Sequence, residues 1–420
     1  MLPVDPTTGL PQTSSIGFIV VPSSPSPIVT PSSASLSVAS MTLVINGFNF
    51  DPSTAGNVVK LSSGTVGSVM FASPTSLTIM FAMTPNPGPL FASVTAFGLS
   101  SGMVLVATVP SNLLVVNGLT SSLMGCTLSG SSLTSCSILF GPEATTGTWN
   151  VNKPQGVAIA NNVAYITNLP QQGSADPTGS GTGNTVSQCA ISGGSITSCS
   201  VPSGVTWNLN NPSGIAIQNN VAYITNNNGN TVTECQITSG SITSCAVPTG
   251  VTWNLNGPSG IAIQNNVAYI TNYDVNTVTQ CTITSGSITS CAVPTGVTWN
   301  LNGPWGIAVA NNVAYITNYN VNTVTQCTIT SGSITSCTVP TGFDWNLQYP
   351  IGIAIQNNVA YIVSQNSVGA RSPFITQCAI NGQVGGSIFA CSVPTFFNDD
   401  PWYSPTTGIF YLFPNAIALI

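Results

Sequence analysis

The stretch GIAIQNNVAYITN, residues 214–226, decides the fold because it recurs along most of the chain. Two further copies and one looser copy follow at steps of 46 residues, and another looser copy precedes it. The copies begin at Gly156, Gly214, Gly260, Gly306 and Gly352. A repeat of this length predicts one supersecondary unit that is stacked several times.

Each copy contains four short segments with strand-like composition. In the copy that starts at Gly214 they read GIAI, VAYIT, TVTECQI and SITSCAV. Asn219 and Asn220 join the first two, and Asn tolerates the positive φ of a tight hairpin. The first two segments are apolar on both faces, as expected for strands between neighbouring sheets, whereas the last two alternate with Ser and Thr. Four antiparallel strands per repeat predict a β-propeller blade.

The first two segments also resemble a known repeat. PSGIAI followed by NNVAYITN is similar to the NHL and YVTN propeller repeats, and the similarity extends over residues 111–420. The chain lacks the Asp and Arg positions usual in those repeats and adds a pair of cysteines to each copy. The resemblance therefore implies a propeller and carries over no functional residue.

The 12 cysteines form six pairs along the chain, five with nine intervening residues and the last with twelve. Each pair brackets the turn between the third and fourth segments, so we expect a disulfide within each hairpin and an oxidising compartment. Bridges between adjacent blades are the alternative. A zinc site is disfavoured because its ligands must converge in one place, usually with His. The expected pairs are Cys126 with Cys136, Cys189 with Cys199, Cys235 with Cys245, Cys281 with Cys291, Cys327 with Cys337, and Cys378 with Cys391.

Counting the cysteine pairs predicts six blades. The hairpin at 119–138 has a cysteine pair but no inner strands before it, whereas 408–413 and 416–420 look like inner strands without outer ones. Joining these two ends completes a sixth blade and closes the ring, which removes exposed strand edges. In an alternative assignment, 113–116 is the second strand of this blade and the C-terminal part supplies one strand fewer.

Residues 25–110 differ from the repeat. Short apolar or alternating runs separated by Gly, Pro, Asn and Ser predict a β-sandwich. The segment TLVINGFNF at 42–50, with PIV at 27–29 and GLSSG at 98–102, resembles the IPT/TIG family of immunoglobulin-like domains. The resemblance implies a spacer or interaction module without catalytic residues. Residues 1–24, rich in Pro, Ser and Thr, are predicted to be a flexible lead-in.

Charge is scarce. Lys and Arg number 3, Asp and Glu 9, and His 0, so 3% of residues are charged, against roughly 25% in an average chain. Three cations cannot neutralise a run of phosphates, which argues against nucleic acid and against anionic lipid. No apolar run reaches the ~20 residues of a membrane helix. We expect no membrane insertion, no cofactor and no bound metal.

Candidate binding residues lie in loops on one predicted face. Trp149, Trp207, Trp253, Trp299 and Trp345 recur before each inner strand, and a wedge between blades explains them better than a ligand does. The residues that differ between copies are better candidates: Trp305, which replaces Ser or Gln, with Tyr273, Tyr319, Asp274 and Trp402. Aromatic rings stack on sugars and apolar surfaces, and neighbouring amides bind hydroxyls.

Carboxylates are the remaining candidates for chemistry. Glu234 stands where other copies have Gln, Asp274 falls in a loop, and Asp399 and Asp400 precede Trp402. Catalysis or calcium binding needs several oxygens that converge, and nothing in the spacing requires this. We therefore expect solvated surface carboxylates, no catalytic residues and no enzymatic activity.

These features predict an exported, non-enzymatic binding or adhesion scaffold that recognises a protein or a glycan through one propeller face. We expect it in the extracellular space, at the cell surface or in the periplasm, although residues 1–6 lack the basic start and apolar core of a signal peptide. Two alternatives remain: a propeller enzyme of the lyase or lactonase type, and a structural subunit of a surface layer or filament.

Overall fold

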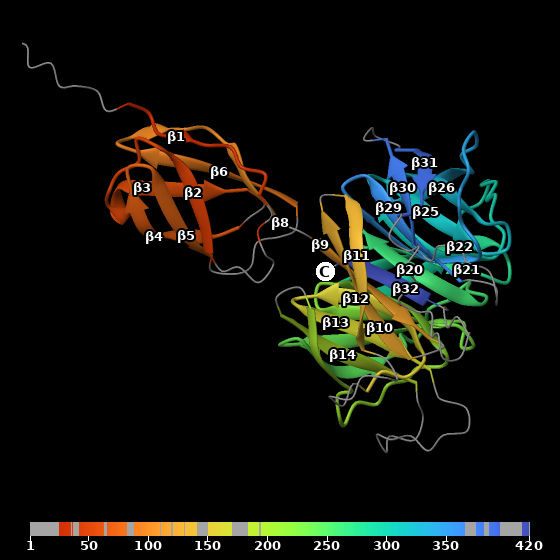
Figure 1. Cartoon of the computed structure of the whole chain (residues 1–420). Coiled ribbons are helices and arrows are strands. Elements are labelled where there is room, and N and C mark those ends of the chain that lie inside the picture. Colours follow the sequence, from red (N-terminus) through yellow and green to blue (C-terminus); the bar gives the residue numbers. More distant parts are fainter. Residues whose placement is uncertain are drawn as a thin grey trace, which may run out of the picture. The chain divides into compact units, whose positions relative to one another are not determined.

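A computed structural model describes residues 25–34, 36, 42–62, 65–81, 88–109, 111–118, 121–129, 131–140, 150–169, 184–192, 195–365, 375–381, 386–394 and 414–419. The chain divides into two compact units, one of residues 1–34 and 41–107 and one of 35–40 and 108–420 (Figure 1). Apart from one 3-10 turn at Thr54–Gly56, the elements of the described residues are all strands. The predicted all-β class is confirmed.

The described part of the first unit contains two antiparallel sheets. One has the order β1 (Ile28–Val29), β2 (Thr42–Phe48), β5 (Ser76–Phe81) and β4 (Gly67–Ser73). The other has the order β3 (Asn57–Leu61), β6 (Gly88–Ala96) and β7 (Leu99–Ser100), and β8 (Val104–Val109) also pairs with β6. Exposed and buried residues alternate along β2, and its buried residues form a core with Leu77, Ile79 and Val94. One face of this sheet is thus buried and the other is open.

The described part of the second unit contains six four-stranded antiparallel sheets, which is the arrangement of a β-propeller. Five of them follow the sequence repeat: β12 (Pro154–Ala160), β13 (Val163–Asn168), β14 (Thr185–Ser192), β15 (Ser195–Ser200); β16 (Pro212–Gln218), β17 (Val221–Asn226), β18 (Thr231–Thr238), β19 (Ser241–Ala246); β20 (Pro258–Gln264), β21 (Val267–Asn272), β22 (Thr277–Thr284), β23 (Ser287–Ala292); β24 (Pro304–Ala310), β25 (Val313–Asn318), β26 (Thr323–Thr330), β27 (Ser333–Thr338); and β28 (Pro350–Gln356), β29 (Val359–Ser364), β30 (Ile375–Ile380), β31 (Ile388–Ser392).

The remaining sheet joins distant parts of the chain. It consists of β32 (Pro414–Leu419), β9 (Ser111–Asn117), β10 (Ser122–Ser129) and β11 (Ser132–Phe140), and β32 pairs antiparallel with β9 (Figure 1). The preferred assignment, in which 408–413 and 416–420 form two inner strands, is therefore wrong. The alternative holds, because the apolar residues at 113–116 occupy the second position; residues 408–413 lie outside the described part.

The first strands of these sheets contact one another in a closed cycle, in the order β12, β16, β20, β24, β28, β32 and back to β12. Glycine permits their close approach. A Cβ on Gly306 would lie 2.0 Å from the carbonyl oxygen of Ile351, and one on Gly214 would lie 2.5 Å from that of Ser259. The recurring Gly of each copy is therefore a packing requirement at the axis.

The structure confirms the tight turn and the two-sided apolar strands that the repeat predicted. Asn219 and Asn220, which join β16 to β17, have φ of 49° and 61°, as a tight hairpin requires. The hydrophobic cores lie between adjacent sheets; one of them combines Tyr165 and Val186 from one sheet with Ile224 from the next. This explains why the first two strands of each copy are apolar on both faces.

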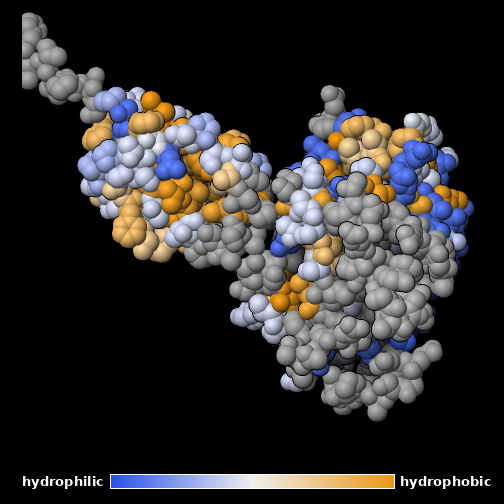
Figure 2. Space-filling view, viewed as in Figure 1, coloured by the Kyte–Doolittle hydropathy of each residue, from blue (hydrophilic) through white to orange (hydrophobic). Residues whose placement is uncertain are grey.

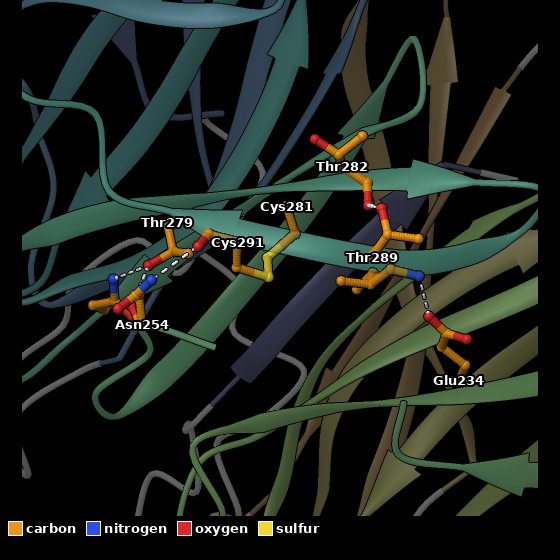
Figure 3. The surroundings of a disulfide bond; sticks show 9 residues. Glu234, Asn254, Thr279, Cys281, Thr282, Thr289 and Cys291 are labelled. Carbon is orange, nitrogen blue, oxygen red and sulfur yellow. Dashed lines mark hydrogen bonds between the residues drawn. A yellow bond between two sulfur atoms is a disulfide. The ribbon is translucent and has the colours of Figure 1, made fainter. Parts of the chain in front are cut away.

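All six predicted disulfides are present, and each joins the third and fourth strands of one sheet. The bonds connect Cys126 to Cys136, Cys189 to Cys199, Cys235 to Cys245, Cys281 to Cys291, Cys327 to Cys337, and Cys378 to Cys391. Cys281 and Cys291, shown in Figure 3, are direct cross-strand neighbours of β22 and β23 with Cα atoms 4.1 Å apart. The alternative of bridges between sheets is thereby overturned, because register within the hairpin already places the two residues opposite each other.

Candidate functional site

The residues that recur in every copy hold neighbouring sheets together. A fully buried tyrosine on the second strand of each repeat donates its hydroxyl to a backbone carbonyl in the third-to-fourth-strand turn of the next sheet. The pairs are Tyr165 with Gly240, Tyr223 with Gly286, Tyr269 with Gly332, Tyr315 with Gly386 and Tyr361 with Ser131. These contacts build the cycle of sheets, so a functional site is better sought where copies differ.

The recurring tryptophans also have a structural role, as predicted. Trp207, Trp253, Trp299 and Trp345 are partly buried and pack on the hydrophobic cores between adjacent sheets. Trp149 lies outside the described residues. Their repetition is thus explained by packing, which leaves the aromatic residues found in single copies.

Glu234 corrects one expectation, because it is not a solvated surface carboxylate. It is only 9% exposed and bridges to the next sheet, where the Ile288 amide donates to its Oε1 at 2.5 Å and the Ser287 hydroxyl to its Oε2 at 2.9 Å. Figure 3 shows the carboxylate of Glu234 pointing toward the sheet that carries Cys281 and Cys291. Burial raises the pKa of Glu234, and these two hydrogen bonds partly offset the rise. Burial of Tyr223 and the nearby Glu234 charge raise the pKa of that tyrosine to about 12.

Three of the five predicted binding residues come together with one that was not predicted. Tyr273 follows β21, Tyr319 follows β25, Trp305 is the second residue of β24, and Tyr349 precedes β28. The end of each second strand lies beside the start of its first strand, so all four residues lie at one end of the sheets. We call them the aromatic cluster.

The rings of the aromatic cluster touch in sequence. The ring centroids of Tyr273 and Trp305 are 5.3 Å apart, those of Trp305 and Tyr319 5.7 Å, and those of Tyr319 and Tyr349 5.1 Å. The first pair meets edge to face, with 77° between planes, and the other two are tilted by 37° and 39°. Tyr349 is 37% exposed and the other three are partly buried. The cluster is therefore a row of packed rings that solvent can still reach.

Tyr349, which stands at a distinctive position of the repeat, was not predicted from the sequence. Its φ is 50°, in the left-handed region that a bulky residue rarely adopts. The equivalent positions before the other first strands of the repeat hold Lys153, Asn211, Gly257 and Gly303, with φ of 40°, 55°, 57° and 61°. Since all five copies keep this left-handed conformation, the signal in the aligned copies is the residue type, an aromatic ring in the place of Lys, Asn or Gly.

Neutral polar groups border the cluster. The hydroxyl of Tyr319 donates to Oε1 of Gln365 at 3.2 Å, and Nε2 of Gln365 donates to Oδ1 of Asn415 at 3.5 Å. Burial raises the pKa of Tyr319, and the phenol groups of Tyr273 and Tyr349 raise it further. The phenol group of Tyr319 thus lies near enough to those of Tyr273 and Tyr349 to interact with each of them.

The cluster adjoins a small axial cavity of about 80 Å³. The cavity is lined by the starts of the six first strands: Gln155–Val157, Ser213–Ile215, Ser259–Ile261, Trp305–Ile307, Ile351–Ile353 and Asn415–Ile417. Trp305 belongs to both the cluster and this lining. The described lining thus offers hydroxyl, amide, aromatic and aliphatic groups, and it holds no carboxylate.

The other two predicted residues are not part of the cluster as described. Asp274 is exposed, and its carboxylate lies close over Gly257, where an added Cβ would be 2.5 Å from Oδ2. Trp402 lies outside the described residues, as do Asp399 and Asp400. Within the described part of the chain, no group of three or more His, Cys, Asp or Glu could hold a metal ion, and no helix is long and apolar enough to cross a bilayer.

No family model and no curated protein matches this chain. A solved structure of a protein of unknown function from Bacteroides thetaiotaomicron aligns with 88% of this chain and 90% of its own, at 14% identity and a TM-score of 0.47. A chain of a nidogen/laminin complex aligns over 74% of this chain and 98% of its own length, at 14% identity and a TM-score of 0.48. A protein from Lactobacillus plantarum aligns over 74% of this chain and 99% of its own length, at 12% identity and a TM-score of 0.45. Similarities at this level carry no argument about binding or activity.

Proposed function

We propose that this protein is an exported, non-enzymatic binding scaffold that recognises a protein or a glycan through one face of a six-bladed propeller. The observation that carries the proposal is the aromatic cluster. Its four rings occupy positions where most other copies use Ser, Gln, Asn or Gly, so the packing of the sheets does not require them. Large exposed aromatic side chains are the residues most enriched where proteins bind ligands.

The six-bladed architecture is supported by the cycle of first strands and by the sheet that β32 completes. We include in the proposal an NHL-like repeat type and an immunoglobulin-like sandwich of the IPT/TIG type for the first unit. The latter rests on the sequence resemblance and on two antiparallel sheets with a buried core.

Export is supported by the cysteines. All twelve are paired, in a chain with 3% charged residues, and disulfides of this number persist in oxidising compartments. A lyase or lactonase would be favoured by carboxylates that converge on the axis. The described residues of the axial cavity place none there, so this alternative has less support than binding.

The proposal is tested by a binding screen with the immobilised full chain against proteins and glycans, run in parallel with Trp305→Ser. Serine is the residue at this position in two other copies, Ser213 and Ser259, so the variant should fold. We expect at least one partner that binds the natural chain and is lost with Trp305→Ser. If every partner binds both proteins equally, the proposed face is wrong.

A second candidate function, a structural subunit that assembles with itself, is favoured by a separate observation in the first unit. The outward face of the sheet β1-β2-β5-β4 carries apolar side chains that are 44–63% exposed and no charged residue, and Figure 2 shows hydrophobic residues on this unit. These residues are Ile28, Val44, Phe48, Phe71 and Met80. Exposed apolar patches on a sheet commonly mark contact surfaces.

Sedimentation velocity over a concentration series tests this candidate. Self-association that the double variant Phe48→Ser with Phe71→Ser abolishes would support it. Val58→Ser, at a residue that is 57% exposed on β3 of the other sheet, is the matched control. A chain that stays monomeric at every concentration would remove the structural-subunit candidate.

A further inference from the structure

The chemistry of the aromatic cluster narrows the kind of ligand. Two of its hydroxyls, those of Tyr273 and Tyr349, have no hydrogen-bond partner among the described residues. The third, on Tyr319, is bonded to Gln365, whose amide in turn reaches Asn415. The cluster therefore combines ring surface that solvent reaches with neutral amides and with hydroxyls that no described residue bonds. A pyranose has the complementary pattern, an apolar C–H face with hydroxyls around its rim.

The lack of positively charged side chains among the described residues around the cluster disfavours an anionic ligand. The polar atoms at the edge of the cluster are phenols and amides, and the charged residue next to it in sequence is Asp274, which is exposed. Recognition of phosphate, sulfate or carboxylate groups uses Arg or Lys. No Arg or Lys occurs among the described residues of the cluster or of the segments 273–276, 319–322 and 349–353 around it. A ligand with no net charge fits these surroundings best.

The position of the cluster also disfavours an extended peptide. Peptides that add a strand need a free sheet edge, where backbone groups are unpaired. Tyr273 and Tyr319 instead follow second strands, which are paired on both sides. Trp305 and Tyr349 lie at the starts of first strands, whose unpaired edge faces the axial cavity. The adjacent axial cavity, about 80 Å³, is well below the ~300 Å³ at which ligand pockets begin. A ligand would therefore lie across the rings rather than enter the axis.

We propose that the aromatic cluster is a binding site for a neutral saccharide, in which a sugar ring packs on Trp305 and Tyr349 while its hydroxyls bond Tyr273, Tyr319 and Gln365. This proposal rests on the proposed function, because it names the ligand class of the same face. It also accounts for a tyrosine at a left-handed position where other copies use Lys, Asn or Gly, since a ring there lengthens the row of aromatic surface by one residue.

Two variants that borrow residues from other copies test the site without removing a structural contact of the repeat. Trp305→Ser installs the residue of Ser259, and Tyr349→Gly installs the residue of Gly303, which has a similar φ. Trp253→Phe, at a tryptophan that packs between sheets, is the matched control. Melting temperatures of all variants establish that they fold.

The natural chain and the variants are titrated calorimetrically with neutral oligosaccharides of glucose, mannose and galactose, with sulfated and sialylated glycans, and with a peptide library. We expect a neutral oligosaccharide to bind the natural chain and Trp253→Phe. Trp305→Ser and Tyr349→Gly should each lower its affinity about tenfold, as loss of one stacking contact predicts.

Three results would overturn the inference, and they differ in what they leave standing. Binding that depends on Trp305 but occurs only with acidic glycans or peptides would refute the neutral saccharide and keep the proposed face. Absence of any binding that depends on Trp305, in every arm, would refute both proposals. Neutral saccharide binding that is equal in all variants would place the sugar elsewhere and refute this site.

Discussion

Removing one disulfide should lower the free energy of unfolding by an amount that the separation of its two cysteines along the chain predicts. In the double variant Cys281→Ala with Cys291→Ala, the bridge between β22 and β23 is lost, while the flanking register pairs of the hairpin remain. The sequence separation of the two residues is 10. A disulfide stabilises mainly because it limits the unfolded chain, so the size of this loop sets the effect.

For a loop of this size the chain-entropy relation predicts a loss of about 2.7 kcal/mol at 25 °C. With an unfolding entropy of about 2.1 cal/mol/K per residue, the second unit should lose roughly 4 °C in melting temperature. The separation of Cys378 and Cys391 is 13, and because the dependence on length is logarithmic, their removal should cost only about 0.2 kcal/mol more.

Urea unfolding followed by tryptophan fluorescence, with thermal scans at several rates, measures both variants against the natural chain. Unchanged midpoints for both would refute the reasoning, since they would show that the unfolded state is equally restricted without the bridge. Losses that differ by several kcal/mol between the two pairs would also contradict it, because burial in the folded state rather than loop closure would then decide the effect.

Three further predictions concern contacts between sheets. Burial raises the pKa of Glu234 above its ordinary 4.5, so the folded state holds that proton more tightly than the unfolded chain, and stability falls as pH rises through the folded value. Glu234→Gln should remove this fall and raise the melting temperature at pH 7 but not at pH 4; equal gains at both would contradict the assignment. Gly306→Ala should lower the free energy of unfolding, measured with urea, by about 1–3 kcal/mol, because the added Cβ would lie 2.0 Å from the carbonyl oxygen of Ile351. An unchanged free energy would mean that the first strands can move apart at the axis. Tyr223→Phe should lower the free energy of unfolding by about 1–1.5 kcal/mol, because the carbonyl of Gly286 loses the tyrosine hydroxyl. Tyr269→Phe should lower it less, because the carbonyl that Tyr269 bonds keeps a second donor, Nε2 of Gln280 at 3.3 Å. The reverse order in thermal unfolding would exclude this explanation.

The sequence by itself determined what depends on neighbours within one repeat. The 46-residue period, the Asn219–Asn220 hairpin and the spacing of cysteines such as Cys281 and Cys291 predicted four-stranded sheets with one disulfide each, and the structure contains them. These features are readable because strand alternation, turn conformation and hairpin register arise from residues close in sequence. The choice of Trp305, Tyr273 and Tyr319 as a group came from the same alignment of copies.

Tertiary structure alone decided what depends on the next sheet or on the far end of the chain. The pairing of β32 with β9 could not be chosen from apolar runs that fit either strand position. Glu234 looked like a solvated carboxylate because its partners, Ser287 and Ile288, belong to another copy. Tyr349 joins Trp305 through Tyr319 across separate sheets. Convergence of this kind is set by the packing of one sheet on another, which no pattern within a single repeat contains.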